Sequence, residues 1–286
     1  MGRRIQISGV QAMLLSAFCF SLMNVFVRLA PGIPTHQAVF FRALIMFVLT
    51  CITLRSLKIS FVGKHFKALF VRSFFGTAGL TTYFYTLKHM PLASAVTLQY
   101  ISPIFSTLLA MPMLGEKVTL KQLSYFALAL LGVAMVKGFD PRISASMLLI
   151  SLVSTFCSAV AYNQIRWLKG KEHPIRIVLY FSGINTLCIA PYTLTHWVWP
   201  TESEWILMIL MATAAHLAQL FLTYALQSDK IANITLLNYT GVIYALFFGA
   251  LLFGESMTWL AIAGMLLIII GVVLGNLSRS QLKANT

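Results

Sequence analysis

The most prominent pattern along the chain is a series of long apolar runs separated by short polar connections. Each run is about 18 or more residues long, enough to cross a bilayer as a helix. Membrane strands would be shorter and would alternate in polarity. The pattern predicts an all-α integral membrane protein with ten transmembrane helices, at about residues 10–29, 36–54, 69–88, 92–112, 120–137, 145–166, 176–196, 204–225, 232–253 and 258–277.

Composition agrees with this prediction and places the charges. Only 10% of the residues are charged, against about a quarter in a soluble domain. If the N-terminus is cytoplasmic, most Lys and Arg residues fall in inner loops, and only Arg28, Lys88, Lys137 and Arg142 fall outside. This asymmetry follows the positive-inside rule. It predicts a protein of the bacterial inner membrane with both termini cytoplasmic, and it assigns the net charge of +14 to lipid contact rather than to nucleic acid.

The chain also contains an internal repeat. When Glu116 is set over Glu255, the same offset aligns Tyr100 with Tyr239 and, further upstream, Asn24 with Asn163. Each copy holds five apolar segments, and because five is odd, the second copy enters the membrane from the opposite side. We therefore expect two inverted five-helix repeats, over residues 1–140 and 141–286, an arrangement typical of secondary transporters.

A Gly-Glu pair follows the fourth and the ninth segment. Glycine readily adopts the left-handed conformation that ends a helix. A threonine three residues after each glutamate is suited to cap the next helix, and a carboxylate before that helix faces its positive end. A tight helix-end turn is the first interpretation, and a gating role is the alternative, for Gly115, Glu116, Gly254 and Glu255.

Several short motifs in fixed order resemble the EamA-type family of drug/metabolite transporters. They are "VFFRAL" in the second segment, "RSFFGTAGLTTYFYTLKHMPLASAVTLQYISPIF" across the third and fourth, and "LLGEK" and "LFGES" after the fourth and ninth. The resemblance covers essentially the whole chain. It implies alternating access around a central cavity lined mainly by segments 1, 3, 4, 6, 8 and 9. The second half has no counterpart of Arg42 or Pro103, so any role of these two residues is not shared by the repeats.

Polar residues inside the apolar segments are the candidates for binding a solute. Arg42 lies about six residues into its segment, where it is suited either to clamp a carboxylate or phosphate or to snorkel toward the outer interface. Arg72, near the inner end of its segment, is interpreted as a cytoplasmic anchor. The predicted substrate-binding residues are Asn24, Arg42, Tyr83, Tyr85, Gln99, Tyr100, Asn163, His216, Gln219, Asn238 and Tyr239.

Interhelical hydrogen bonds and plain packing are the alternatives for these residues. His216 and Gln219 share a helix face because they are three residues apart. Tyr83 and Tyr85 point to roughly opposite sides, so only one is expected to line the cavity. Pro103 is expected either to interrupt the fourth segment beside the cavity or to make a packing kink.

No Asp or Glu lies in the middle of an apolar segment. This disfavours carboxylate-based ion coupling and leaves uniport, exchange or coupling through histidine. The cysteines and histidines show no metal-ligand spacing, and no hydrolase motif is present, so we predict no cofactor, no metal site, no catalytic residue and no enzymatic activity.

The expected function is secondary transport of a small organic metabolite, amino-acid-like or carboxylated. The alternatives are uptake of a nucleoside-like metabolite such as S-adenosylmethionine, a passive channel or scaffold, and, remotely, a membrane-embedded enzyme. The expected partners are the solute and the bilayer, with a homodimer left open. The sequence fixes neither the direction of transport nor a coupling ion.

Overall fold

A computed structural model describes residues 8–115, 119–139, 143–227 and 240–284. Helices account for every regular element in these ranges, which contain no strand. Glu116, Asn238 and Tyr239 lie outside the described residues. The helices are α1 (Gly9–Leu29), α2 (Thr35–Ser56), α3 (Phe66–His89), α4 (Leu92–Gln99), α5 (Ser102–Leu114), α6 (Leu120–Phe139), α7 (Ala145–Trp167), α8 (Pro174–Thr195), α9 (Glu202–Gln227), α11 (Thr240–Phe253) and α12 (Trp259–Ala284).

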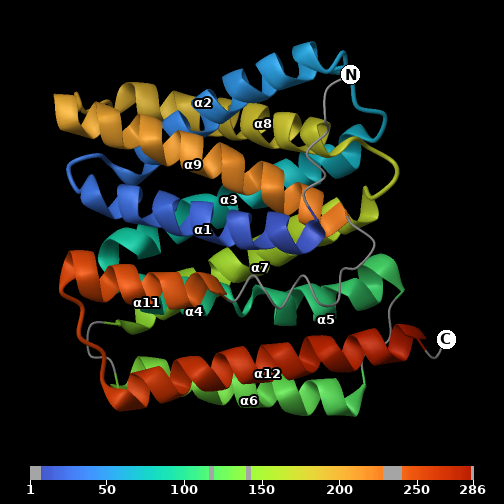
Figure 1. Cartoon of the computed structure of the whole chain (residues 1–286), viewed down its shortest axis with the longest axis vertical. Coiled ribbons are helices and arrows are strands. Elements are labelled where there is room, and N and C mark those ends of the chain that lie inside the picture. The colour runs from blue at the N-terminus through green and yellow to red at the C-terminus, as the bar shows by residue number, and fades with distance from the viewer. Residues whose placement is uncertain (1–7, 116–118, 140–142, 228–239, 285–286) are drawn as a thin grey trace.

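The helices lie side by side and run roughly along a common direction (Figure 1). Six spans in the described ranges are long and apolar enough to cross a membrane, namely α1, α2, Leu92–Met113, α7, α8 and Glu202–Ala225. Shorter apolar helices cover Leu123–Met135, Thr240–Phe253 and Trp259–Gly275. The described residues thus confirm the all-helical prediction, and their apolar spans agree with a membrane protein.

The fourth apolar run is interrupted in its middle. α4 ends at Gln99, and α5 begins at Ser102 with Pro103 in its first turn. Proline suits that position because the amide it lacks would have no partner inside the helix. The interruption leaves Tyr100 and Ile101 between the two helices. Of the two alternatives for Pro103, the structure therefore shows an interruption of the segment.

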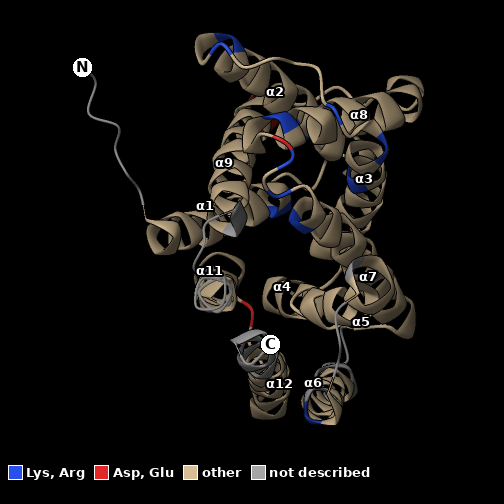
Figure 2. Ribbon diagram, turned by 90° about the vertical axis from the view of Figure 1, so that its right-hand side faces the viewer, with Lys and Arg blue, Asp and Glu red and all other residues tan. Residues whose placement is uncertain are grey.

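Four helix pairs form the framework of the bundle: α1 with α9, α3 with α7, α2 with α8, and α6 with α12. Figure 2 views the bundle end-on and shows α6 and α12 together at one edge, apart from the group that contains α2, α3, α8 and α9. The break between α4 and α5 lies on the inner side of this framework, beside α7 and α11.

Glycines bring α6 and α12 into close contact. A Cβ on Gly132 would lie 2.5 Å from the carbonyl oxygen of Gly264, and one on Gly271 would lie 2.6 Å from the carbonyl oxygen of Tyr125. Small residues are favoured between membrane helices because they let the backbones approach. These two glycines therefore set the spacing of the pair.

We expect Gly271→Val to push α12 away from α6. The added side chain has no room, so the substitution should destabilise the protein by roughly 1–3 kcal/mol. Thermal unfolding in detergent measures the change. Leu266→Val, at an exposed position of α12, is the matched control, and equal melting temperatures for the two variants would contradict the packing role.

The bundle has two ends. α1 begins and α12 ends at one of them, which we call the termini end, and the opposite one is the far end (Figure 1). At the termini end the buried carboxylate of Glu172 accepts hydrogen bonds from the His65 backbone amide at 2.9 Å and from Arg176 Nη1 at 2.6 Å. This contact fastens the α2–α3 connection to the start of α8.

The Glu172 contact should depend on pH. Burial alone would raise the pKa of Glu172, but the hydrogen bonds from Arg176, His65 and Lys64 hold it below its ordinary value of 4.5. A lowered folded-state pKa stabilises the fold above the ordinary value, and this stabilisation is lost as the pH falls through the folded-state pKa. Limited proteolysis of the α2–α3 connection should therefore accelerate as the pH falls below about 4.5.

In Glu172→Gln the α2–α3 connection should be cleaved fast at neutral pH as well. The neutral amide cannot form the ion pair with Arg176 or accept all the hydrogen bonds of the carboxylate. Glu202→Gln, at an exposed position near the start of α9, serves as the control. A wild-type cleavage rate that stays constant between pH 7 and pH 3 would contradict the prediction.

Candidate functional site

A cavity of about 160 Å³ lies near the α4–α5 break. Its lining comes from α1, α3, α4, α5, α7, α9 and α11, with one residue each from α2 and α8. The expected lining segments thus contribute, and α2 and α8 are additional. The polar lining residues are Ser21, Asn24, Arg42, Arg72, Tyr83, Gln99, Tyr100, Ser102, Ser158, Tyr162 and Gln219.

Two arginines form a positively charged side of this cavity. Arg42 and Arg72 are 1% and 3% exposed. Both guanidinium groups lie over the ring of Phe181, at 5.7 Å and 4.1 Å from its centroid. A guanidinium over an aromatic face gains a cation–π attraction. Phe181 therefore holds two like charges on one face of the cavity.

The hydrogen-bonding capacity of the two arginines is not used by the described protein groups. Nε and Nη1 of Arg42 and Nε of Arg72 are buried without a hydrogen-bond partner in the described part of the chain. Buried polar groups are nearly always paired, and a buried charge without a partner is costly. Unpaired donors at a cavity wall point to an anionic group as the ligand.

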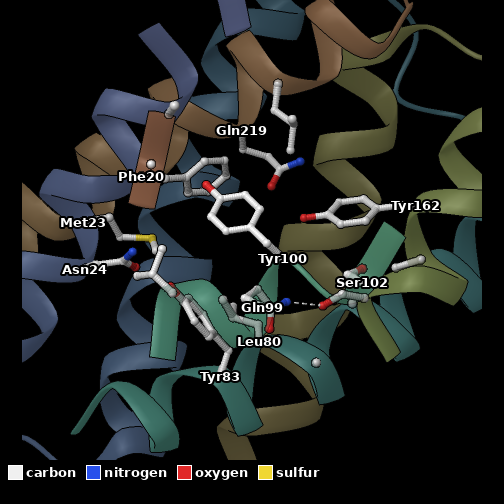
Figure 3. Close-up of a pocket in the computed structure, with 18 of the residues that line it drawn as sticks. Phe20, Met23, Asn24, Leu80, Tyr83, Gln99, Tyr100, Ser102, Tyr162 and Gln219 are labelled. Atoms are coloured by element: carbon white, nitrogen blue, oxygen red, sulfur yellow. Dashed lines mark hydrogen bonds between the residues drawn. The ribbon is translucent and has the colours of Figure 1, made fainter. Parts of the chain in front are cut away.

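Neutral polar residues of α4 and α7 also line the cavity. Gln99 donates a hydrogen bond from Nε2 to Ser158 Oγ at 2.8 Å and accepts one from Ser154 Oγ at 3.2 Å. The Tyr162 hydroxyl and the Gln219 amide point into the pocket, while the Tyr100 ring lies between them and Phe20 with its hydroxyl directed toward Phe20 (Figure 3). Tyr162 lines the same cavity as Arg42 and Arg72, so a neutral phenol and two cations are available to one ligand.

Glycines make room for the cavity side chains. A Cβ on Gly76 would collide with Nη1 of Arg72 and would lie 2.8 Å from the Phe181 ring. A Cβ on Gly241 would collide with the Tyr100 hydroxyl. Gly79 instead packs on α7, where Ser154 Oγ donates to its carbonyl at 2.7 Å.

The structure brings six of the predicted site residues to the cavity, namely Asn24, Arg42, Tyr83, Gln99, Tyr100 and Gln219. Only Tyr83 of the two tyrosines on α3 lines it, as expected, while Tyr85 is exposed and stacks on His89. His216 is buried beside the cavity without lining it, and its Nδ1 has no hydrogen-bond partner among the described groups.

Asn163 lies away from the cavity. Its Oδ1 accepts from Ser106 Oγ at 2.7 Å, and its Nδ2 donates to the Ser106 carbonyl at 2.9 Å. It joins α7 to α5, which corresponds to the alternative of an interhelical hydrogen bond. Asn24 and Asn163, although equivalent in the repeat, therefore have different surroundings.

Arg72 was expected to anchor the cytoplasmic end of its helix, and the structure contradicts this. The side chain is buried and lines the cavity. The sequence holds a signal for this position, because Gly76 lies four residues later on the same helix face and leaves space for the guanidinium. Tyr162, Ser158 and Phe181 were also missed, since nothing in their neighbourhood distinguishes them from packing residues.

The predicted helix-end turns are present. Gly115 and Gly254 have φ of 68° and 60°, the left-handed conformation expected of them. Thr258 Oγ1 accepts a hydrogen bond from the Ala261 amide at 3.2 Å and so caps α12, as predicted. The equivalent Glu116 lies outside the described residues.

Glu255 binds a different helix from the one expected. Its carboxylate accepts hydrogen bonds from the amide of Leu92, the first residue of α4, at 2.9 Å and 3.0 Å. It also forms an ion pair with Arg28 at the end of α1, and Arg28 donates to the Met90 carbonyl at 3.2 Å. We call this contact of Arg28, Glu255 and Leu92 the far-end latch.

The described part of the chain contains no group of three or more His, Cys, Asp and Glu side chains placed to hold a metal ion.

Comparison with known proteins gives consistent matches along the chain. The EamA-like transporter family model matches twice, over residues 7–138 and 145–277. The pseudopaline exporter CntI of Pseudomonas aeruginosa is 31% identical, with 96% of this chain and 97% of the relative covered. An uncharacterised transporter of Helicobacter pylori is 27% identical, over 84% of this chain and 85% of the relative.

More distant relatives agree. Solute carrier family 35 member G1 of Mus musculus is 22% identical, over 95% of this chain and 78% of the relative. A crystal structure of another protein is 15% identical and covers 95% of this chain and 98% of that chain, with a TM-score of 0.64, which shows a similar fold. The apolar helices, the polar cavity and the two family matches lead to one assignment: this chain is a membrane transporter, not an enzyme, and belongs to the EamA-like transporter family.

Proposed function

We propose that this transporter moves a small organic metabolite bearing a carboxylate, amino-acid-like or otherwise carboxylated, across the bacterial inner membrane by alternating access. The observation that carries the proposal is Arg42, which is 1% exposed, lines the cavity and has two unpaired nitrogens. A guanidinium fork matches a carboxylate in shape and charge. A snorkelling arginine would instead extend toward the membrane surface.

We also propose that the chain consists of two inverted five-helix repeats, over residues 1–140 and 141–286. The pairwise packing supports this division. In this division α1 of the first half is equivalent to α7 of the second, and α3 is equivalent to α9. The contact of α1 with α9 is therefore equivalent to the contact of α7 with α3. The pairs α2–α8 and α6–α12 each map onto themselves. The two separate matches of one family model are a second support.

The proposed orientation places the termini end in the cytoplasm. The Lys and Arg residues of the α2–α3 and α7–α8 connections lie at that end, and Figure 2 shows basic segments there around α2, α3 and α8. Excess positive charge marks the cytoplasmic side of membrane proteins. The far-end latch then closes the periplasmic side of the cavity, which gives Glu255 a gating role beside its turn.

The direction of transport is a separate proposal. The Pseudomonas relative is named an exporter and matches nearly the full length of this chain, which favours export over uptake. A nucleoside-like solute is the second candidate substrate, because Phe20, Tyr83, Tyr100 and Tyr162 offer aromatic faces in the same cavity. Such a solute would depend on these rings and not on Arg42.

The test is flux in proteoliposomes with a panel of labelled amino acids, carboxylates and nucleosides. We expect saturable flux of one or more carboxylated solutes, lost in Arg42→Gln and retained in Arg55→Gln, an exposed arginine of the same helix. Circular dichroism confirms that both variants are folded. Flux of nucleosides alone, unchanged in Arg42→Gln, would overturn the carboxylate proposal.

A further inference from the structure

The two arginines of the cavity also indicate how many negative charges the solute carries. Arg42 and Arg72 come from different helices, α2 and α3, and both approach the ring of Phe181 on α8. The two side chains are buried, and each has at least one nitrogen without a hydrogen-bond partner in the described part of the chain. The cavity therefore holds two positive charges at one side.

Neither charge has a counter-ion among the described carboxylates. Glu172 is bound by Arg176 and His65 at the termini end, and Glu255 is bound by Arg28 at the far end. The other two described carboxylates belong to the first turn of α9 and do not line the cavity. A solute with one negative charge would thus leave the second arginine uncompensated.

From this balance, and on the basis of the proposed function, we propose that the transported solute carries two negative charges close together and that the carrier changes its orientation only when loaded. Dicarboxylates and phosphate monoesters share the required chemistry. Gln99, Ser158 and Tyr162, which are neutral polar groups of the same cavity, bind the remainder of the solute through hydrogen bonds to its hydroxyl or carbonyl groups rather than through a further charge.

The requirement for a loaded carrier follows from electrostatics. Alternating access closes the cavity on one side before opening it on the other, which removes the arginines from water for part of the cycle. Two like charges close together in a dry site repel each other and lose their hydration. A bound dianion neutralises both. The empty carrier therefore meets a higher barrier than the loaded one, and counter-exchange is faster than net flux.

Proteoliposomes with and without internal solute test this inference. Uptake of labelled succinate, glycerol 3-phosphate and alanine is measured into empty vesicles and into vesicles preloaded with each unlabelled compound. We expect uptake of one or both dianions to rise about tenfold or more when a dianion is inside, which corresponds to a barrier lower by at least about 1.4 kcal/mol. Succinate represents the dicarboxylates and glycerol 3-phosphate the phosphate monoesters, so the two probes distinguish these classes of dianion.

The variants Arg72→Gln and Arg55→Gln are measured beside the wild type. Arg72→Gln leaves one cavity cation, so it should shift the preference from dianions to alanine or a monocarboxylate such as lactate, and it should raise uptake into empty vesicles relative to preloaded ones. Arg55→Gln, at an exposed position, should change neither ratio. Folding of each variant is checked by its elution profile in detergent.

Two other outcomes are informative in different ways. Saturable alanine uptake that preloading does not stimulate, and that Arg42→Gln abolishes, would overturn the dianion inference while leaving the carboxylate proposal intact. If none of the three probes and no member of the carboxylate panel moves through folded protein, the proposed function itself fails.

Discussion

Arg42→Met is expected to stabilise the empty transporter and to impair transport of carboxylated solutes. Arg42 is fully buried and has unpaired nitrogens, so its charge destabilises the folded protein when no solute is bound. Replacing buried charged groups with apolar side chains of similar size often stabilises proteins by about 1–4 kcal/mol. Loss of charged hydrogen bonds to the solute should lower the transport efficiency by about 100-fold.

Thermal unfolding of the ligand-free protein and flux in proteoliposomes measure the two effects together. The opposite signs are the informative point, because a purely structural arginine would lower both stability and flux when replaced. Arg55→Met, an exposed residue on the same helix, is the matched control and should change neither. A lower melting temperature for Arg42→Met would contradict the assignment of an unpaired charge.

Glu255→Gln is expected to open the far end of the bundle. The carboxylate joins the ends of α1 and α11 to the first residue of α4 through Arg28 and the Leu92 amide. Breaking a buried ion pair costs about 3–5 kcal/mol, and the partial exposure of Arg28 reduces this to about 1–3 kcal/mol. Gln retains the shape but not the charge, so Arg28 loses its ion pair and keeps only its hydrogen bond to the Met90 carbonyl.

Opening is measured with a cysteine at Ser21, which lines the cavity, in a background that lacks the four native cysteines. A membrane-impermeant thiol reagent is added outside intact cells. Labelling should be several-fold faster in the Glu255→Gln background, and Glu202→Gln, an exposed residue at the same end, should label at the wild-type rate. Equal labelling in all three would refute the latch and leave Glu255 as a turn residue.

The helices and their breaks were predictable because each has a local cause. Runs of apolar residues indicated the spans, Gly115 and Gly254 the helix ends, and Pro103 the interruption that exposes Gln99 and Tyr100 to the cavity. Such signals depend on a few neighbouring residues and on the properties of the bilayer.

The identity of the cavity residues was only partly predictable, since it depends on which helix faces meet. Arg72 looked like an interfacial anchor because distance along a helix says nothing about rotation toward a neighbour. Asn163 looked equivalent to Asn24, but Ser106 on α5 satisfies its amide. The partner of Glu255 lies 163 residues earlier in the chain, beyond the reach of any local pattern.

The most direct test of the central claim, that the cavity arginines bind the carboxylate of the solute, is a thermal-shift titration of purified protein with the solute panel. Carboxylated compounds that bind should raise the melting temperature of the wild type and of Arg55→Met. They should have no effect on Arg42→Met, and dicarboxylates should have a smaller effect on Arg72→Met than on the wild type, although both variants start from higher values. A carboxylated solute that stabilises all four proteins equally would show that it binds elsewhere and would contradict the claim.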